Sequence, residues 1–240
     1  MPASAPETSS PRTRVRTRAL AAVSILGVLG FLVCVTLAAA WYPGGTWMNR
    51  RAIGHSLWGN YLCDLMQLRA RNGEPMPVGS VVARAGTLLM CVAMACFYEQ
   101  VARLERTSAL AGVTRSVGLL GAALACAIPF LPSDQFRVGH LVAVVAAFLP
   151  SLVACAAAAA LCLRSPTSSR AIKLAALVAV IFGGLDGGLY ILAYVSFWLG
   201  YVPPRETQLL VNELLPALQR VASFALVAWV LAVALQSRDD

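Results

Sequence analysis

The sequence contains little charge. Asp, Glu, Lys and Arg make up 12% of its 240 residues, whereas hydrophobic residues make up 59% and the mean hydropathy is +0.72. Because a soluble domain carries about 25% charged residues, this scarcity excludes an ordinary soluble domain, a disordered chain and a coiled coil. Only a lipid bilayer solvates so much apolar surface, so the composition predicts an integral membrane protein.

The sequence also lacks the short motifs of common metal and hydrolase sites. Its seven cysteines include no CxxC pair, and six of them lie in apolar stretches, where cysteine behaves as a small hydrophobe. We therefore expect no disulfide framework and no thiolate metal site. The patterns HExxH, HxxxH and GxSxG are absent, and no internal repeat is found.

Six apolar segments are long enough to cross a bilayer core of about 30 Å at 1.5 Å per helical residue. They predict an all-α fold, a polytopic membrane bundle of six transmembrane helices within residues 19–236. The expected helices cover residues 19–41, 78–98, 108–131, 140–163, 172–198 and 208–235. Residues 1–18 are rich in Pro, Ser, Thr and Arg, and we expect a disordered basic tail there, with a second short tail at 237–240.

The distribution of positive charge predicts the orientation. If the N-terminus lies inside, the inner flanks hold eleven basic residues: Arg12, Arg14, Arg16, Arg18, Arg103, Arg106, Arg115, Arg164, Arg170, Lys173 and Arg238. The outer flanks then hold seven: Arg50, Arg51, Arg69, Arg71, Arg84, Arg137 and Arg205. The positive-inside rule favours two cytoplasmic termini. This topology accounts for the net charge of +8, so no nucleic-acid partner is expected.

The first external loop, residues 42–77, is the longest connection. Between residues 51 and 71 it holds no proline, and polar and apolar residues alternate at helical spacing: Ser56, Asn60, Asp64, Gln67 and Arg71 against Leu57, Tyr61, Leu65 and Leu68. This pattern predicts an amphipathic helix at about 51–71, lying on the outer surface or over the mouth of the bundle.

Four ionisable residues fall within the predicted spans, where each is costly and needs a reason: Arg84, Asp186, Glu213 and Arg220. One interpretation is that they pair with one another and stabilise the bundle. The other is a polar cavity that opens outward. The glycines around Asp186 have the spacing of close helix packing, and Tyr190 and Tyr194 share its helix face as lining of a ligand pocket or as interfacial packing.

The only histidines, His55 and His140, both fall on the predicted outer side. With Asp64 and Asp134 they would complete a site of two histidines and a carboxylate, or form a His–Asp acid/base pair. No cofactor is predicted, and a divalent metal such as zinc stays an open alternative. We assign no metal ligands.

Three tracts resemble an uncharacterised family of bacterial six-helix integral membrane proteins that is loosely grouped with the Frag1/DRAM-like proteins. They are the first-loop signature at residues 42–46 and 54–65, Pro132-Ser133-Asp134 with His140, and Gln219-Arg220 with Trp229. The resemblance covers most of residues 19–235. It implies a six-helix fold in the bacterial cytoplasmic membrane and no agreed activity.

The chain departs from this family at three positions in or directly after the signature. Cys63-Asp64-Leu65-Met66 stands where the family usually has Ser-Asp-Leu-Gly, and His55 stands where it has Tyr. Asp64, Asp134, His140 and Gln219 carry over. A looser similarity links the chain to ceramidase and adiponectin-receptor hydrolases, whose HxxxH pair it lacks, and to small membrane-bound terpene cyclases, which work with acidic residues alone.

The residues favour a membrane-embedded enzyme that acts on a lipid or isoprenoid by acid/base chemistry, because a carboxyl group in an apolar pocket donates a proton at neutral pH. The candidate catalytic residues are Asp64, Asp134, His140, Asp186 and Glu213. The candidate substrate-binding residues are His55, Trp58, Asn60, Arg84, Tyr190, Tyr194, Gln219 and Arg220. The expected partners are membrane lipids and a hydrophobic small molecule. A small transporter or ion path and a non-catalytic scaffold stay open as alternatives.

Overall fold

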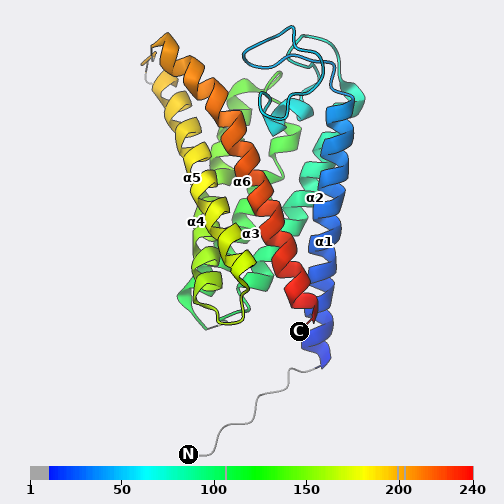
Figure 1. The fold of residues 1–240 in the computed structure, drawn as a ribbon, viewed down its shortest axis with the longest axis vertical. Coiled ribbons are helices and arrows are strands. Elements are labelled where there is room, and N and C mark those ends of the chain that lie inside the picture. The colour runs from blue at the N-terminus through cyan, green and yellow to red at the C-terminus, as the bar shows by residue number, and fades with distance from the viewer. Residues whose placement is uncertain (1–10, 106, 199, 203, 240) are drawn as a thin grey trace, which may run out of the picture.

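The computed structural model describes residues 11–105, 107–198, 200–202 and 204–239, and these form a bundle of six long helices (Figure 1). The helices are α1 (Pro11–Ala40), α2 (Pro77–Val101), α3 (Ala109–Ala125), α4 (Arg137–Arg164), α5 (Arg170–Trp198) and α6 (Arg205–Asp239). Two short 3₁₀ helices complete the fold, η1 (Leu62–Met66) and η2 (Ile128–Phe130). All six helices contain segments long and apolar enough to cross a membrane, so the predicted multi-pass membrane bundle is confirmed.

Local chemistry explains several helix boundaries. Pro77 occupies the first turn of α2, where its missing N–H costs nothing. Ser108 precedes α3, and its side chain accepts a hydrogen bond from the backbone N–H of Ala111 at 3.2 Å, which satisfies one free donor of the first turn. The third span, predicted at 108–131, agrees with the candidate membrane span Ala109–Phe130. Within it α3 ends at Ala125, and η2 completes the segment.

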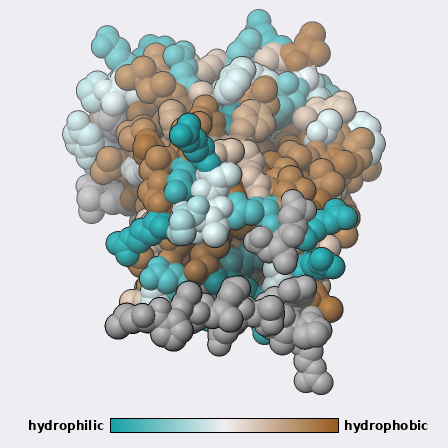
Figure 2. All heavy atoms as spheres, turned by 60° about the horizontal axis from the view of Figure 1, so that its bottom comes forward, coloured by the Kyte–Doolittle hydropathy of each residue, from teal (hydrophilic) through white to brown (hydrophobic). Residues whose placement is uncertain are grey.

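The helices are packed as a closed ring. Each helix contacts the next one in the chain, and α1 also contacts α6, while α2 additionally touches α4 and α6. Both described ends of the chain lie at the same end of the bundle, and the 42–76 loop covers the opposite end (Figure 1). With the end nearer the termini turned forward, Figure 2 shows hydrophilic side chains gathered on that end beside broad apolar patches.

Two predictions about the terminal segments need correction. The tail predicted at 1–18 is helical from residue 11 onward, because α1 begins at Pro11 and continues through the arginine-rich stretch. Arginine is a good helix former, so the span extends beyond its apolar part. Residues 237–239 likewise belong to α6, while residues 1–10 and 240 lie outside the described part of the chain.

The predicted amphipathic helix at 51–71 is wrong. The segment is an irregular loop with η1 and two isolated β-bridges, Gly44 to Ile53 and Arg69 to Pro75. The polar side chains that suggested a helix bind the loop's own backbone instead: Ser56 Oγ accepts from the N–H of Gly59, and Asn60 Oδ1 accepts from the N–H of Ser56. Such local bonds compete with helix formation.

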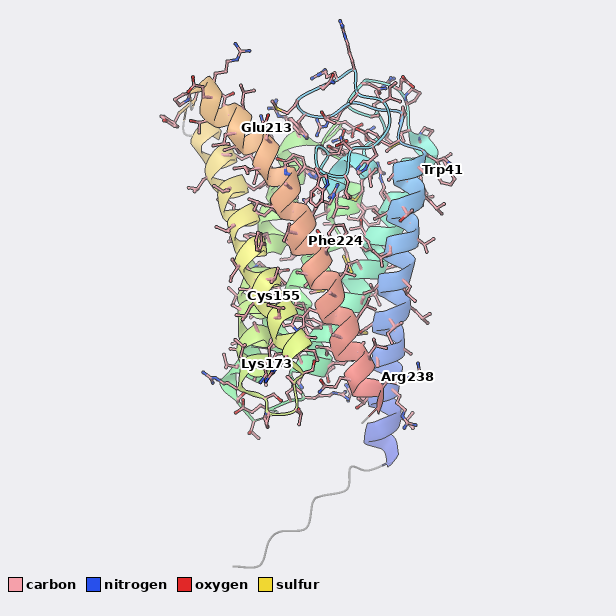
Figure 3. The ribbon with its side chains drawn as sticks, viewed as in Figure 1. Trp41, Cys155, Lys173, Glu213, Phe224 and Arg238 are labelled. Carbon is pink, nitrogen blue, oxygen red and sulfur yellow. The ribbon has the colours of Figure 1, made fainter. Side chains whose placement is uncertain are left out.

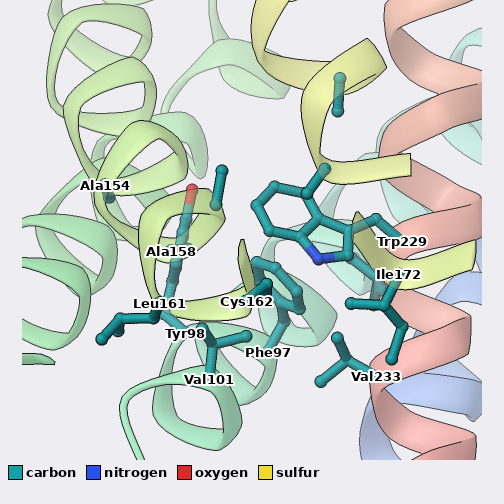
Figure 4. Packing of buried hydrophobic residues seen from close by; sticks show 14 of the residues in the cluster. Phe97, Tyr98, Val101, Ala154, Ala158, Leu161, Cys162, Ile172, Trp229 and Val233 are labelled. Carbon is teal, nitrogen blue, oxygen red and sulfur yellow. The ribbon is translucent and has the colours of Figure 1, made fainter. Parts of the chain in front are cut away.

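The main hydrophobic core lies in the half of the bundle nearer the termini, because its residues come from the ends of α2, α4 and α6 and the starts of α3 and α5. Figure 4 shows part of its packing. Its largest fully buried side chains are Trp229, Tyr98 and Phe97, and the rings of Phe97 and Trp229 meet edge to face with centroids 4.8 Å apart. A second cluster lies directly under the loop and includes Tyr42, Leu65 and Met66. The space between these two clusters holds the candidate site.

Candidate functional site: a roofed cavity inside the bundle

The loop of residues 42–76, here called the roof, is organised around the carboxylate of Asp64. This side chain is fully buried. Its Oδ1 accepts from Arg71 Nε and Nη2, at 2.9 and 2.6 Å, and from Gln67 Nε2 at 3.2 Å. Its Oδ2 accepts from the N–H of Tyr61 at 3.0 Å and from Asn60 Nδ2 at 3.2 Å. Both oxygens are therefore occupied, and Asp64 supports the roof.

The two predicted intramembrane arginines hold the roof to the helices. Arg84 on α2 donates from Nε and Nη2 to the carbonyl oxygen of Met66, at 3.1 and 2.9 Å. Arg220 on α6 is buried and donates from Nη2 to the carbonyl oxygen of Asn60 at 2.7 Å. The neighbouring Gln219 Oε1 accepts from the N–H of Leu62 at 2.8 Å. These bonds satisfy roof backbone groups that have no partner in a regular helix.

The junction between η2 and α4 forms a third anchor. Asp134 is exposed, and its Oδ2 accepts from the backbone N–H groups of Leu68 and Arg69, at 3.0 and 3.3 Å. Ser133 Oγ accepts from Gln67 Nε2 at 2.8 Å. Asp134 thus fixes the outer part of the roof and lies outside the cavity lining.

Under the roof lies a cavity of about 370 Å³, lined by the roof, by η2 and by all six helices. Most of its lining is apolar or aromatic. Sulfur-containing side chains adapt to irregular apolar ligands. Six of them line the cavity: Cys63, Met66, Met90, Cys91, Met94 and Cys155. A cavity of this size and composition is typical of a small-molecule site.

Two titratable side chains line this cavity from neighbouring helices, Asp186 on α5 and His140 on α4. Asp186 is partly buried and makes no hydrogen bond or ion pair with any described residue, although its charge interacts with that of Arg220. His140 is 4% exposed, and its Nδ1 lies 2.7 Å from the carbonyl oxygen of Leu131. Because a carbonyl only accepts, Nδ1 carries a proton, and Nε2 has no partner among the described residues.

Further polar side chains line the cavity from α5 and α6 and at its end near Tyr98. Tyr190 lies one turn beyond Asp186 and packs against Tyr194, with ring centroids 4.5 Å apart. Gln219 and Ser223 line the cavity from α6. At the far end, the hydroxyl of Tyr98 lies 3.3 Å from Cys155 Sγ. The polar groups of α5 and α6 thus face a largely apolar space.

The structure divides the predicted site residues into two groups. His140, Asp186, Tyr190 and Gln219 line the cavity. The others support the roof or lie outside the cavity. Roof groups are bound by Asp64, Asn60, Arg84, Arg220 and Asp134, and His55 packs against Tyr42 within the roof. Tyr194 packs on Tyr190, whereas Trp58 is exposed, as is Glu213 toward the roof end of α6 (Figure 3). Among the described residues, no ion pair joins Arg84, Asp186, Glu213 and Arg220, so the interpretation of mutual pairing is wrong.

Two roof residues have electrostatic surroundings that limit their roles. Burial raises the pKa of the Cys63 thiol to about 12, with a further contribution from the nearby charge of Asp64, so the thiol stays protonated and does not replace a serine nucleophile. Burial lowers the pKa of His55 to about 4. Its Nε2 is buried without a hydrogen-bond partner, and its ring packs edge-on against Tyr42.

Several lining residues carried no signal in the sequence. Thr87, Ser151 and Ser223 are single hydroxyls in apolar helices, and nothing in their spacing distinguished them from packing residues. The sulfur-rich character of the lining was equally hidden, because its members come from the roof, α2 and α4. Residues from separate helices can be recognised as the lining of one cavity only when the helices are placed in space.

A metal site of two histidines and a carboxylate, which the sequence leaves open, stays untested. In the described part of the chain, no three His, Cys, Asp or Glu side chains gather as a metal-binding group. Comparison with protein-family models, with curated proteins and with solved structures gave no match. The family resemblance of the first-loop signature therefore stays a prediction.

Proposed function

We propose that this membrane protein is an enzyme that acts on a lipid or isoprenoid molecule bound in the roofed cavity. The observation that carries the proposal is the presence of a carboxyl group without a partner, Asp186, and an imidazole nitrogen without a partner, His140 Nε2, on one largely apolar cavity. An unpaired ionisable side chain inside a membrane protein is a functional candidate because it is costly to keep there.

The two groups are suited to proton transfer in both directions. In a cyclisation, the Asp186 carboxyl gives its proton to an alkene carbon, a second alkene attacks the resulting cation and closes the ring, and His140 Nε2 takes a proton from the new cation. In a hydrolysis, His140 Nε2 takes a proton from the attacking water and Asp186 protonates the leaving group. In both schemes a proton then passes from His140 back to Asp186, which restores the starting state, and no redox cofactor is needed. Tyr190 and Gln219 orient the polar part of the substrate.

The lining favours an unsaturated or irregular apolar substrate. Thioether and thiol groups are polarizable and make favourable contacts with π systems, and aromatic rings such as Phe31, Phe148 and Tyr98 also face the cavity. A substrate of this kind partitions into the bilayer before it binds.

The transport alternative has less support. A path across the bundle would have to pass the fully buried Phe97 and Trp229 at one end. At the other end it would have to pass the roof, which Arg84, Arg220 and Asp134 hold in place. The cavity is therefore better suited to holding a molecule than to conducting one.

Comparative lipid analysis tests the proposal. Wild type, Asp186→Asn, His140→Gln and the exposed control Glu213→Gln are expressed in the same host at matched membrane abundance, and lipid extracts are compared by liquid chromatography and mass spectrometry. We expect the amount of at least one lipid or isoprenoid species to differ between the host without the protein and the host that expresses wild type or Glu213→Gln. The change should be lost in the other two variants while their melting temperatures stay close to that of wild type. Identical lipid profiles for wild type and Asp186→Asn would contradict the proposal.

A further inference from the structure

A second charged feature lies at the end of the bundle opposite the roof. Here three arginines surround one glutamate, and we call the four residues the Glu99 cluster. Arg115 Nε on α3 lies 2.7 Å from Glu99 Oε2, Arg103 Nη2 lies 3.1 Å from Oε1, and Arg16 Nη2 on α1 lies 3.5 Å from Oε1. The cluster therefore joins the ends of three helices through a single carboxylate.

The charges of the cluster do not balance. One carboxylate faces three guanidinium groups, which leaves two positive charges in excess. Arg103 is largely buried and is held further by Thr17 Oγ1 at 3.0 Å. The side chains of Arg16 and Arg115 are 71% and 39% exposed. Among the described residues, Arg16 and the two Nη atoms of Arg115 have no hydrogen-bond acceptor other than Glu99. Two guanidinium groups can therefore bind an additional anion.

The depth of the cluster in the membrane limits which anions can reach it. Glu99 lies in the last turn of α2, and Arg16 lies at the start of the first candidate membrane span. This places the cluster at headgroup depth, at the boundary of the hydrocarbon core. An anion at this depth is in contact with lipid on one side and with water on the other.

The exposed face of α2 leads to the cluster. This face carries four side chains that are 40–63% exposed: Val78, Val81, Leu89 and Val92. Cys96, which is partly exposed, continues the same face toward Glu99, and the spacings along it are three, eight, three and four residues. Such a stripe is one face of a helix. Because α2 contacts both α1 and α3, an acyl chain that lies along this stripe is flanked by the helices that supply Arg16 and Arg115.

We propose that the Glu99 cluster binds the phosphate group of an anionic phospholipid whose acyl chain lies along the exposed stripe of α2. Guanidinium groups bind phosphate oxygens through paired, charge-assisted hydrogen bonds. Glu99 holds the arginines together in the absence of lipid. The site is independent of the roofed cavity and of the reaction proposed there.

Lipid retention measured by native mass spectrometry tests the site. The purified protein is placed in phosphatidylcholine nanodiscs with a minor fraction of phosphatidylglycerol, and the bound phosphatidylglycerol is counted for wild type, Arg16→Gln, Arg115→Gln and Arg170→Gln. Arg170 is an exposed arginine at the same end of the bundle but on α5, so its variant controls for net charge. We expect about a fivefold loss of retention for Arg16→Gln and for Arg115→Gln, from about 1 kcal/mol per arginine, and little change for Arg170→Gln.

A fourth variant separates binding from a structural role. Glu99→Gln removes the competing carboxylate, so we expect phosphatidylglycerol retention to rise even if the melting temperature falls. Equal loss of retention in Arg115→Gln and Arg170→Gln would show a general charge effect and overturn the proposal. Displacement of the phospholipid by inorganic phosphate alone would show that the acyl chain contributes nothing, and it would overturn the lipid site as well.

Discussion

At the scale of single residues, two aspartates in the same bundle have opposite surroundings. Asp64 accepts five hydrogen bonds, including two from Arg71. Asp186 accepts none from the described residues, yet it lines a cavity. A carboxylate with every oxygen occupied has a structural role, because a reacting group must be free to exchange its proton. The choice of Asp186 over Asp64 as the acid rests on this difference.

His55 should make the stability of the roof depend on pH. Its ordinary pKa is 6.5, and burial lowers it to about 4 in the folded roof, helped by the positive charge of Arg220 and opposed by Asp64. Between these pKa values the unfolded roof binds a proton that the folded roof does not. The roof should therefore be fully stable above pH 6.5 and lose stability as the pH falls from 6.5 toward 4.

Hydrogen exchange of the roof amides measures this effect. We expect the protection of residues 42–76 in wild type to fall between pH 7.5 and pH 4.5, after correction for the intrinsic exchange rate. His55→Phe keeps the ring packed against Tyr42 and removes the buried nitrogen without a partner, so its protection should be less dependent on pH. The same loss of protection in His55→Phe would show that another group titrates.

At the scale of helices, the contact between α4 and α5 depends on one glycine. A Cβ atom at Gly187 would collide with the ring of Phe148, whereas Gly183 and Gly188 have open space at the same point. The sequence predicted close packing from the four-residue spacing of these glycines. The structure assigns the tight approach to Gly187 alone, since only that position faces the ring of the neighbouring helix.

Substitution of these glycines tests the contact. We expect Gly187→Ala to destabilise the bundle by about 1–3 kcal/mol, the usual cost of overpacking, and Phe148→Leu in the same chain to restore part of the loss. Gly183→Ala is the matched control, and it should be neutral or stabilising because alanine is a better helix former than glycine. Thermal melting in detergent gives the comparison. Equal melting temperatures for the two alanine variants would refute the assigned contact.

The helices could be predicted from the sequence and the roof could not, for a physical reason. Inside a bilayer the backbone must satisfy its own hydrogen bonds, so a long apolar run has little choice but a helix. The roof lies outside that constraint. There Ser56, Asn60 and Asp64 bind nearby backbone groups, and their four-residue spacing, which suggests a helix, instead reflects turns. The partners of Arg84 and Arg220 are distant roof carbonyls, which no local pattern reveals.

At the scale of the whole molecule, the ring of helices encloses a space that is closed at both ends by different means. Packed aromatic side chains close the end nearer the termini, and the hydrogen-bonded roof closes the other. The cavity between them collects residues from every helix, so no single helix forms the site. This arrangement explains why the charges within the spans do not pair: Arg84 and Arg220 bind the roof, and Asp186 faces the cavity.

The orientation of this asymmetric bundle is the last prediction. Basic residues are more numerous at the end that holds both described chain ends, eleven against seven. The positive-inside rule therefore places this end in the cytoplasm and the roof outside.

Cysteine labelling tests the orientation. Arg51→Cys in the roof and Thr107→Cys between α2 and α3 introduce thiols at exposed positions of opposite ends. The seven native cysteines are all buried or partly buried, so they should react slowly. In intact cells, a membrane-impermeant maleimide should label Arg51→Cys and leave Thr107→Cys unlabelled until the membrane is opened. The reverse pattern would place the roof in the cytoplasm, and the Glu99 cluster would then face the outer leaflet.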